Sequence, residues 1–123
     1  WYQVANSLSL ASSVLQTRLA ARPLCFKDMR NPKAEIFRNV VLEKFVGGIQ
    51  KDVAVMNQRY YDVVQPLQTL EEKFQHVETE SYRTYRVERD QLFARGLNAV
   101  KGHVAAIQPL MVQCGFLPGS PDD

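Results

Sequence analysis

The segment 82–89 contains the side chains best suited to binding a ligand, because aromatic and basic residues alternate along it. These residues are Tyr82, Arg83, Tyr85, Arg86 and Arg89. Rings can stack on bases while guanidinium groups contact phosphates, so the pattern suits a polyanion. Acids dilute this charge at Glu78, Glu80, Glu88 and Asp90. Tyr and Arg are also enriched at protein interfaces, so we favour contact with a partner protein and keep nucleic acid as the alternative.

Catalytic and metal-binding signatures are weak. His76 and Glu80 have the i, i+4 spacing of helical metal ligands, but no further residue completes a recognisable ligand set. His103 lies on an apolar helical segment, where packing or partner contact accounts for it. The motifs GxSxG, GxxxxGK[ST] and GxGxxG are absent from the sequence. We therefore expect a non-enzymatic chain with no catalytic residue, metal or cofactor.

The cysteines are Cys25 and Cys114, which match no CxxC spacing and are too few for a disulfide scaffold. The favoured interpretation is a pair of reduced, partly buried thiols. A disulfide joining the two ends of the chain is the alternative.

Length and composition predict a single helical domain over residues 1–123. The chain has 123 residues, 46% hydrophobic and 23% charged, which is ordinary for a globular protein. Its net charge of +2 is too small to indicate nucleic acid by itself. No stretch approaches the roughly 20 apolar residues of a membrane span.

The first helix is predicted at about residues 3–22, within a segment 1–23. One face carries Val4, Leu8, Ala11, Leu15 and Leu19. Pro23 ends the helix. Residues 1–27 contain no acid and are rich in Ser and Arg, a composition that resembles organellar import sequences and favours an organelle.

A long helical region is predicted at residues 32–114, followed by a tail at 115–123. Asn31 can cap the helix that Pro32 begins. Gly47-Gly48 indicates either a bend or the close approach of another backbone. We expect residues 78–91 to continue the helix, because they contain no Gly or Pro and carry helix-compatible charges.

Two apolar seams run along this region in alternating spacings of three and four, as in coiled coils. The first apolar seam comprises Ile49, Val53, Met56, Tyr60, Val63, Leu67, Leu70, Phe74 and Val77. The second apolar seam comprises Phe93, Leu97, Val100, Val104, Ile107 and Met111. The predicted fold class is therefore all-α, with about three helices that include a long kinked helix or an extended helical hairpin.

The similar segments VVQPLQ and AIQPLM place Pro66 and Pro109 inside the seams. Their flanking residues share little, so we interpret the pair as architecture rather than a repeat. The first seam keeps its phase across Pro66, which predicts a kinked but continuous helix there. At Pro109 we predict a terminal bend or stop.

The seams indicate partners. A helix over residues 49–77 would be about 43 Å long, and a chain this short cannot easily cover it. We therefore predict a structural subunit of a large complex, with helix–helix contacts through the first seam to Phe74 and through Phe93, Leu97, Val100 and Val104. Any membrane association would be peripheral and come through the complex. The alternatives are a nucleic-acid-binding module, a self-assembling capsid or filament subunit, and a surface-binding amphipathic protein.

One family resemblance follows from the first helix. The segment NSLSLASSVLQTRLAARP, with Arg18, Leu19, Ala20, Ala21 and Pro23 at its end, resembles the first helix of subunit d of the mitochondrial ATP synthase peripheral stalk. The segment Glu43-Lys44-Phe45 is similar in kind. The aromatic pattern of that family after the first helix is missing, and residues 26–29 stand in its place. The resemblance implies a divergent stalk subunit with no chemistry of its own. It also implies a mitochondrial location, with another intracellular location as the alternative.

Overall fold

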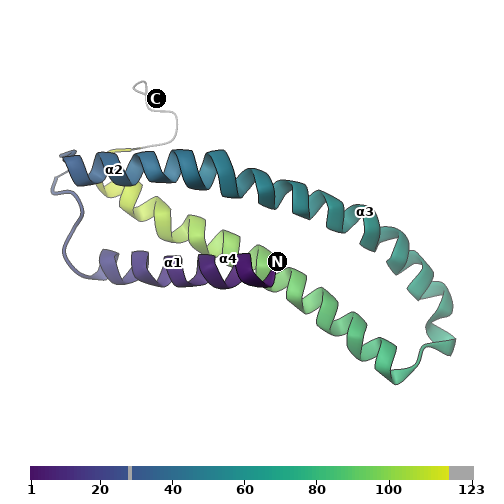
Figure 1. The fold of residues 1–123 in the computed structure, drawn as a ribbon. Helices are drawn as coiled ribbons and strands as arrows, with labels where there is room; N and C mark the ends of the chain where they lie inside the picture. The colour runs from purple at the N-terminus through teal and green to yellow at the C-terminus, as the bar shows by residue number, and fades with distance from the viewer. Residues whose placement is uncertain (28, 117–123) are drawn as a thin grey trace. The chain divides into compact units, whose positions relative to one another are not determined.

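The protein is described by a computed structural model that covers residues 1–27 and 29–116 (Figure 1). The described residues form an all-α fold of three helices. The first is α1 (Tyr2–Ala20), and the third is α4 (Glu80–Gln113). The second is a long joined helix made of α2 (Pro32–Val40), a π-helix η1 (Val41–Ile49), α3 (Gln50–Phe74) and a 3₁₀ turn η2 (Gln75–Val77). The predicted fold class is confirmed.

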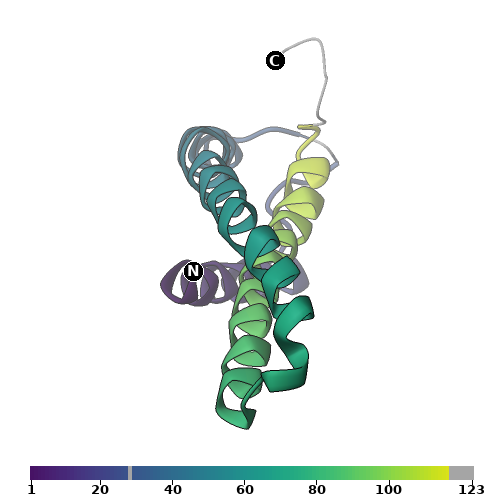
Figure 2. The ribbon, with the colours of Figure 1, turned by 90° about the vertical axis from the view of Figure 1, so that its right-hand side faces the viewer.

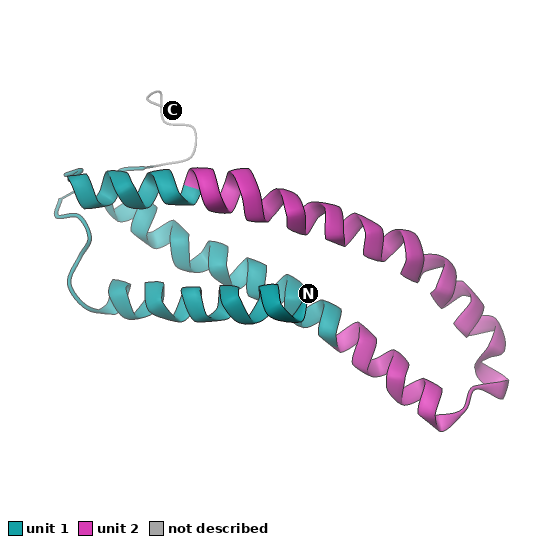
Figure 3. Ribbon diagram, in the orientation of Figure 1, with its two compact units in different colours: residues 1–41, 92–123 teal, residues 42–91 magenta. Residues whose placement is uncertain are grey.

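The chain divides into two compact units (Figure 3). Unit 1 contains residues 1–41 and 92–123, and unit 2 contains residues 42–91. Unit 1 combines two segments that are distant in the sequence, so side chains on different helices must hold it together, whereas unit 2 is one continuous segment. The tail at 117–123 lies outside the described residues.

In unit 1, α1 packs against α4 through Ala5, Leu8 and Ser12, all of which are buried. These residues and the half-buried Val4, Leu15 and Leu19 lie on the apolar face that the sequence predicts, whereas Ala11 is exposed. The start of α1 is held by Trp1, whose ring packs edge-on against Phe93 with centroids 5.3 Å apart.

Gly96 makes room for the indole ring of Trp1. A Cβ atom on Gly96 would lie 2.5 Å from Cε3 of Trp1, closer than van der Waals contact allows. A Cβ atom on Gly102, in the same helix, would meet nothing within 4 Å. The same substitution should therefore have opposite effects at these two glycines.

We expect Gly96→Ala to lower the melting temperature and Gly102→Ala to raise it. Alanine gains about 1 kcal/mol over glycine in a helix interior, and this gain is realised at Gly102. At Gly96 the indole must move away from Phe93, so tryptophan fluorescence should shift to longer wavelength. If Gly96→Ala instead melts at or above the wild-type temperature with unchanged fluorescence, Trp1 does not pack on Gly96.

The long joined helix begins as the sequence predicts. The Asn31 side chain caps α2 by accepting a hydrogen bond from the Ala34 N–H, and Pro32 occupies the first helical position. The Gly47-Gly48 pair lies in the π-helix. A Cβ on Gly47 would approach the Leu42 carbonyl, five residues earlier in the same helix, at 3.2 Å. The close neighbour is thus the helix's own backbone.

In unit 2, α3 passes through Pro66 without reversing, as predicted. The chain then turns at residues 75–79, and α4 starts at Glu80 with the Thr79 hydroxyl accepting from the Tyr82 N–H. Figure 2 shows the last turns of α3 and the first turns of α4 side by side. The expectation of continuous helix from residue 78 is wrong at Glu78 and Thr79, which follow the 3₁₀ turn and are not helical. The turn contains no Gly or Pro, and Thr79 caps the next helix.

The first apolar seam changes phase after Tyr60. Val53 is buried, and Met56 and Tyr60 are half-buried, as the prediction implies. Farther along, the buried positions are Val64 and Glu71, and the predicted positions next to them are exposed. Beyond Tyr60 the buried face is therefore shifted by one residue from the predicted seam. The charged residue Glu71 is buried where the apolar pattern predicts Leu70.

The second apolar seam is buried or half-buried throughout its length in unit 1. The helix continues through Pro109 to Gln113, so of the predicted bend or stop at Gln108-Pro109 the stop is wrong. The helix ends in a Schellman motif, in which Phe116 N–H donates to the Met111 carbonyl and Gly115 N–H to the Val112 carbonyl. Gly115 has φ 70°, which favours glycine.

Candidate functional site

A disulfide bond joins the connector after α1 to the end of α4. The Cα atoms of Cys25 and Cys114 are 5.1 Å apart, within the range of disulfides, and the bond closes a separation of 89 residues. The expectation of reduced thiols is therefore wrong. Both cysteines are buried with Ala34 and Phe116 in one apolar cluster, so α2 and both chain segments share a core at this bond.

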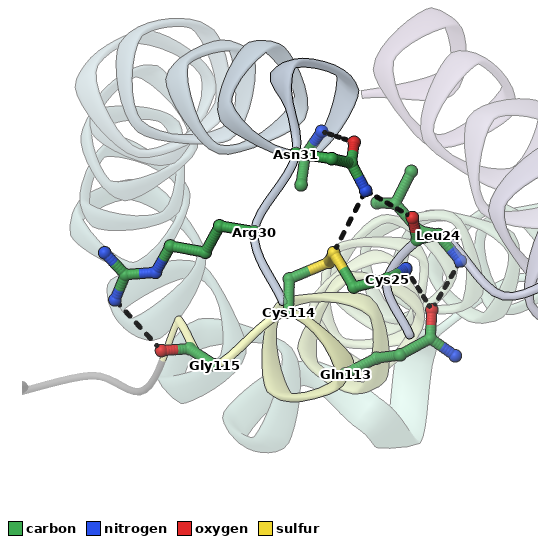
Figure 4. The surroundings of a disulfide bond; sticks show 8 residues. Leu24, Cys25, Arg30, Asn31, Gln113, Cys114 and Gly115 are labelled. Atoms are coloured by element: carbon green, nitrogen blue, oxygen red, sulfur yellow. Dashed lines mark hydrogen bonds between the residues drawn. A yellow bond between two sulfur atoms is a disulfide. The ribbon is translucent and has the colours of Figure 1, made fainter. Parts of the chain in front are cut away.

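Polar side chains fix the backbone around the disulfide (Figure 4). The Gln113 Oε1 atom accepts hydrogen bonds from the Leu24 N–H at 2.7 Å and the Cys25 N–H at 3.4 Å. The Asn31 amide donates to the Leu24 carbonyl at 2.8 Å and to the Cys25 sulfur at 3.7 Å. Because Asn31 also caps α2, one side chain connects the connector, the disulfide and the helix start.

Unit 2 contains a buried ion pair between Glu71 and Arg89. Two guanidinium nitrogens of Arg89 donate to the two Glu71 oxygens at 2.7 and 3.2 Å, and the two side chains are 4% and 11% exposed. Tyr82 donates a third hydrogen bond to Glu71 at 2.9 Å. These contacts, the Arg89 hydrogen bonds first, lower the pKa of Glu71, and the hydrogen bonds that Arg89 donates to Glu71 raise the pKa of Arg89.

Arg89 of the Glu71–Arg89 pair also contacts a second acid, Asp90. Arg89 also donates to Asp90 at 2.9 Å, and Asp90 accepts from the Tyr60 hydroxyl at 3.1 Å. Burial, followed by the Asp90 hydrogen bond, raises the pKa of Tyr60. The bond from Tyr82 to Glu71 raises the pKa of Tyr82 likewise. Both tyrosines therefore stay protonated donors that tie α3 to the start of α4.

The predicted polyanion residues are brought together, but their arginines are used within unit 2. Arg83 pairs with Glu78 at 3.4 Å and Glu80 at 2.9 Å, and Arg86 pairs with Glu78 at 3.0 Å. Arg89 faces Glu71 and Asp90. Tyr82 and Tyr85 lie 5.9 Å apart, and Tyr82 is engaged by Glu71. The alternating Tyr and Arg residues thus form a network of ion pairs and hydrogen bonds around the turn between α3 and α4.

Unit 1 has its own buried polar pair, Ser12 and His103. The Ser12 hydroxyl donates to the Leu8 carbonyl at 2.6 Å, so its oxygen accepts from His103 Nδ1 at 3.0 Å. Burial lowers the pKa of His103. A role in packing, as the sequence suggests for His103, is consistent with this position between α1 and α4.

Acidification below about pH 6.5 should destabilise the fold through His103. Its folded pKa lies below the ordinary histidine value of 6.5, so the unfolded chain takes up a proton that the folded chain does not. We expect the melting temperature to fall from pH 7.5 to pH 5.5, and His103→Asn to remove much of this slope. The exposed His76→Gln is the matched control. Equal slopes in wild type and His103→Asn would contradict this role.

The predicted partner-interface residues divide into three groups. Val53 and Phe93 are buried within the chain. Six others are half-buried: Met56, Tyr60, Leu67, Leu97, Val100 and Val104. The remaining four are exposed: Ile49, Val63, Leu70 and Phe74. Together with Val77, the last three form a line on the joined helix at spacings of seven, four and three residues, which we call the exposed stripe (Val63, Leu70, Phe74 and Val77).

These features define the class as an all-helical protein closed by one disulfide, with buried polar pairs inside each unit. Within the described residues, no group of His, Cys, Asp and Glu is arranged to hold a metal, and no helix has the length and apolar composition of a membrane span. The chain matches a family of proteins of unknown function (DUF3080) over residues 2–118, and it belongs to that family. No curated protein and no solved structure matches it.

The resemblance to ATP synthase subunit d is corrected by this match. The DUF3080 family covers nearly the whole chain, whereas the resemblance covers one helix, and subunit d does not match. The first helix misled because serine-rich amphipathic helices ending in Arg-Leu-Ala-Ala and proline have a common composition.

Proposed function

We propose that this chain is a non-enzymatic helical protein that binds another protein through the exposed stripe and works in an oxidising compartment. The observation that carries the proposal is the exposure of four large apolar side chains on one helix face. Val63 is 67% exposed, Leu70 51%, Phe74 58% and Val77 65%. Apolar side chains that are scattered are ordinary, but an aligned row of them is typical of a surface that packs against another helix.

The disulfide supports the choice of compartment. Disulfides persist in oxidising environments and are rare where thiol reductants act. The Cys25–Cys114 bond lies in an apolar cluster and joins segments 89 residues apart, as expected of a structural bond. We prefer this location to the mitochondrial one, because the latter depended on the composition of residues 1–27 and on the resemblance to subunit d.

Two alternative functions differ in their support. Nucleic acid binding through residues 82–89 has less support than protein binding, because Arg83, Arg86 and Arg89 already form ion pairs with acids. Self-assembly uses the same stripe with a second copy as the partner, and the experiment below separates it from binding of another protein.

Photo-crosslinking in the producing cells tests the proposal. A photoreactive amino acid placed at Leu70 or Phe74 should trap one discrete partner, whereas the same group at Glu72, exposed on the opposite side of α3, should not. Mass spectrometry then identifies the partner as another protein, which supports the proposal, or as a second copy, which supports self-assembly. Equal, diffuse labelling from all three positions would rule out the stripe as an interface.

A further inference from the structure

A basic pocket lies next to the disulfide in unit 1. It has a volume of about 570 Å³, and its lining includes Arg18, Arg22 and Lys33. Leu24 and Asn31, which hold the disulfide region in place, also line it, as does Phe26. No acid is among the described residues that line it. Positive groups from the end of α1 and the start of α2 therefore converge on one concave surface.

The three cations have no acidic partner in the described part of the chain. None of them takes part in the ion pairs seen between described residues, such as those of Arg83, Arg86 and Arg89 in unit 2. Residues 1–27 contain no acid, and the nearest acids in sequence are Asp28, outside the described residues, and Glu35, which does not line the pocket. Unpaired cations around a concavity concentrate positive potential and attract anions.

The pocket is held in shape before any ligand arrives. Asn31 donates to the Leu24 carbonyl at 2.8 Å while capping α2, and the Leu24 N–H donates to Gln113 (Figure 4). An Arg18 guanidinium nitrogen donates to the Arg22 carbonyl at 2.6 Å, which orients Arg18 and leaves its other N–H groups able to donate to a ligand. A preformed site loses less entropy on binding.

We propose that this pocket binds a phosphate group. Guanidinium groups offer paired N–H donors that match phosphate oxygens, and an ammonium adds a point charge. The volume exceeds that of a phosphate ion, and Phe26, 66% exposed, provides an apolar wall for the rest of the ligand. Both a soluble phosphate compound and the headgroup of an anionic lipid have this chemistry. The inference is independent of the protein partner proposed for the exposed stripe.

Binding measurements on the oxidised, full-length chain test this proposal. Inorganic phosphate is titrated at low ionic strength while backbone amide signals are followed by NMR. Flotation with vesicles made of equal parts phosphatidylglycerol and phosphatidylcholine is compared with phosphatidylcholine alone. We expect saturable binding that the double variant R22Q/K33Q weakens about tenfold. The control K51Q/R59Q removes the same charge at exposed positions of unit 2 and should bind like wild type.

The outcomes are distinguishable. Binding of inorganic phosphate in solution supports a soluble ligand, and binding only to phosphatidylglycerol vesicles supports a lipid headgroup. Equal weakening in R22Q/K33Q and K51Q/R59Q would show that diffuse charge, and not the pocket, attracts the anion. Melting temperatures show that both double variants remain folded. Absence of saturable binding by the wild-type protein in both assays would overturn the proposal.

Discussion

Breaking the Cys25–Cys114 disulfide should lower the free energy of unfolding by about 4 kcal/mol. In the chain-entropy account, a cross-link that closes a loop of this length restricts the unfolded chain strongly, and here the link spans 89 residues. The same change should lower the melting temperature by roughly 10–20 °C in a domain of this size. We expect this from the double variant C25A/C114A, measured by circular dichroism.

Reduction provides the control for the disulfide prediction. A reducing agent should lower the melting temperature of wild type to near that of C25A/C114A, and it should leave the variant unchanged. The alanine variant alone also loses two buried sulfur atoms, so agreement between the two treatments isolates the bond. If reduced and oxidised wild type melt at the same temperature, the bond does not hold unit 1 together.

Removing the positive charge of Arg89 should destabilise unit 2 by about 3–5 kcal/mol, because a buried carboxylate is left without its partner. The Glu71 side chain is 4% exposed and accepts two hydrogen bonds from Arg89. Arg89→Met keeps much of the side-chain volume while removing the charge and the donors. Urea unfolding followed by circular dichroism measures the loss.

A double-mutant cycle separates the pair from its surroundings. Glu71→Leu combined with Arg89→Met leaves no buried charge at these two positions and should recover most of the stability lost by Arg89→Met alone. The matched control is Arg83→Met, since Arg83 is 51% exposed and its ion pairs should contribute less than about 1 kcal/mol. If Arg89→Met costs no more than Arg83→Met, the buried pair does not stabilise the turn.

The sequence was sufficient for the local features of this fold. Val4, Leu8, Leu15 and Leu19 indicate the buried side of α1, Asn31 and Pro32 mark the start of the joined helix, and the first seam indicates that Pro66 does not stop it. Each of these signals depends on residues within a few helical turns of one another.

The features that the sequence did not predict depend on pairs that are distant in the chain. Glu71 becomes buried only because Arg89, on the next helix, offers it a partner, so a pattern built on apolar residues assigns that position to Leu70. The turn at Glu78 and Thr79 lacks Gly and Pro. Gly115, directly after Cys114, marks the end of a helix in the sequence. This local signal does not indicate that Cys114 pairs with Cys25, which lies far away in the chain.

The most direct test of the central claim, that Cys25 and Cys114 are joined in the working protein, is the thiol state of the native protein. The producing cells are lysed in acid to stop exchange, and the protein is alkylated before and after reduction and then weighed by mass spectrometry. We predict no alkylation of Cys25 or Cys114 before reduction and alkylation of both afterwards. Alkylation of both cysteines without reduction would contradict the claim and, with it, the proposed oxidising compartment.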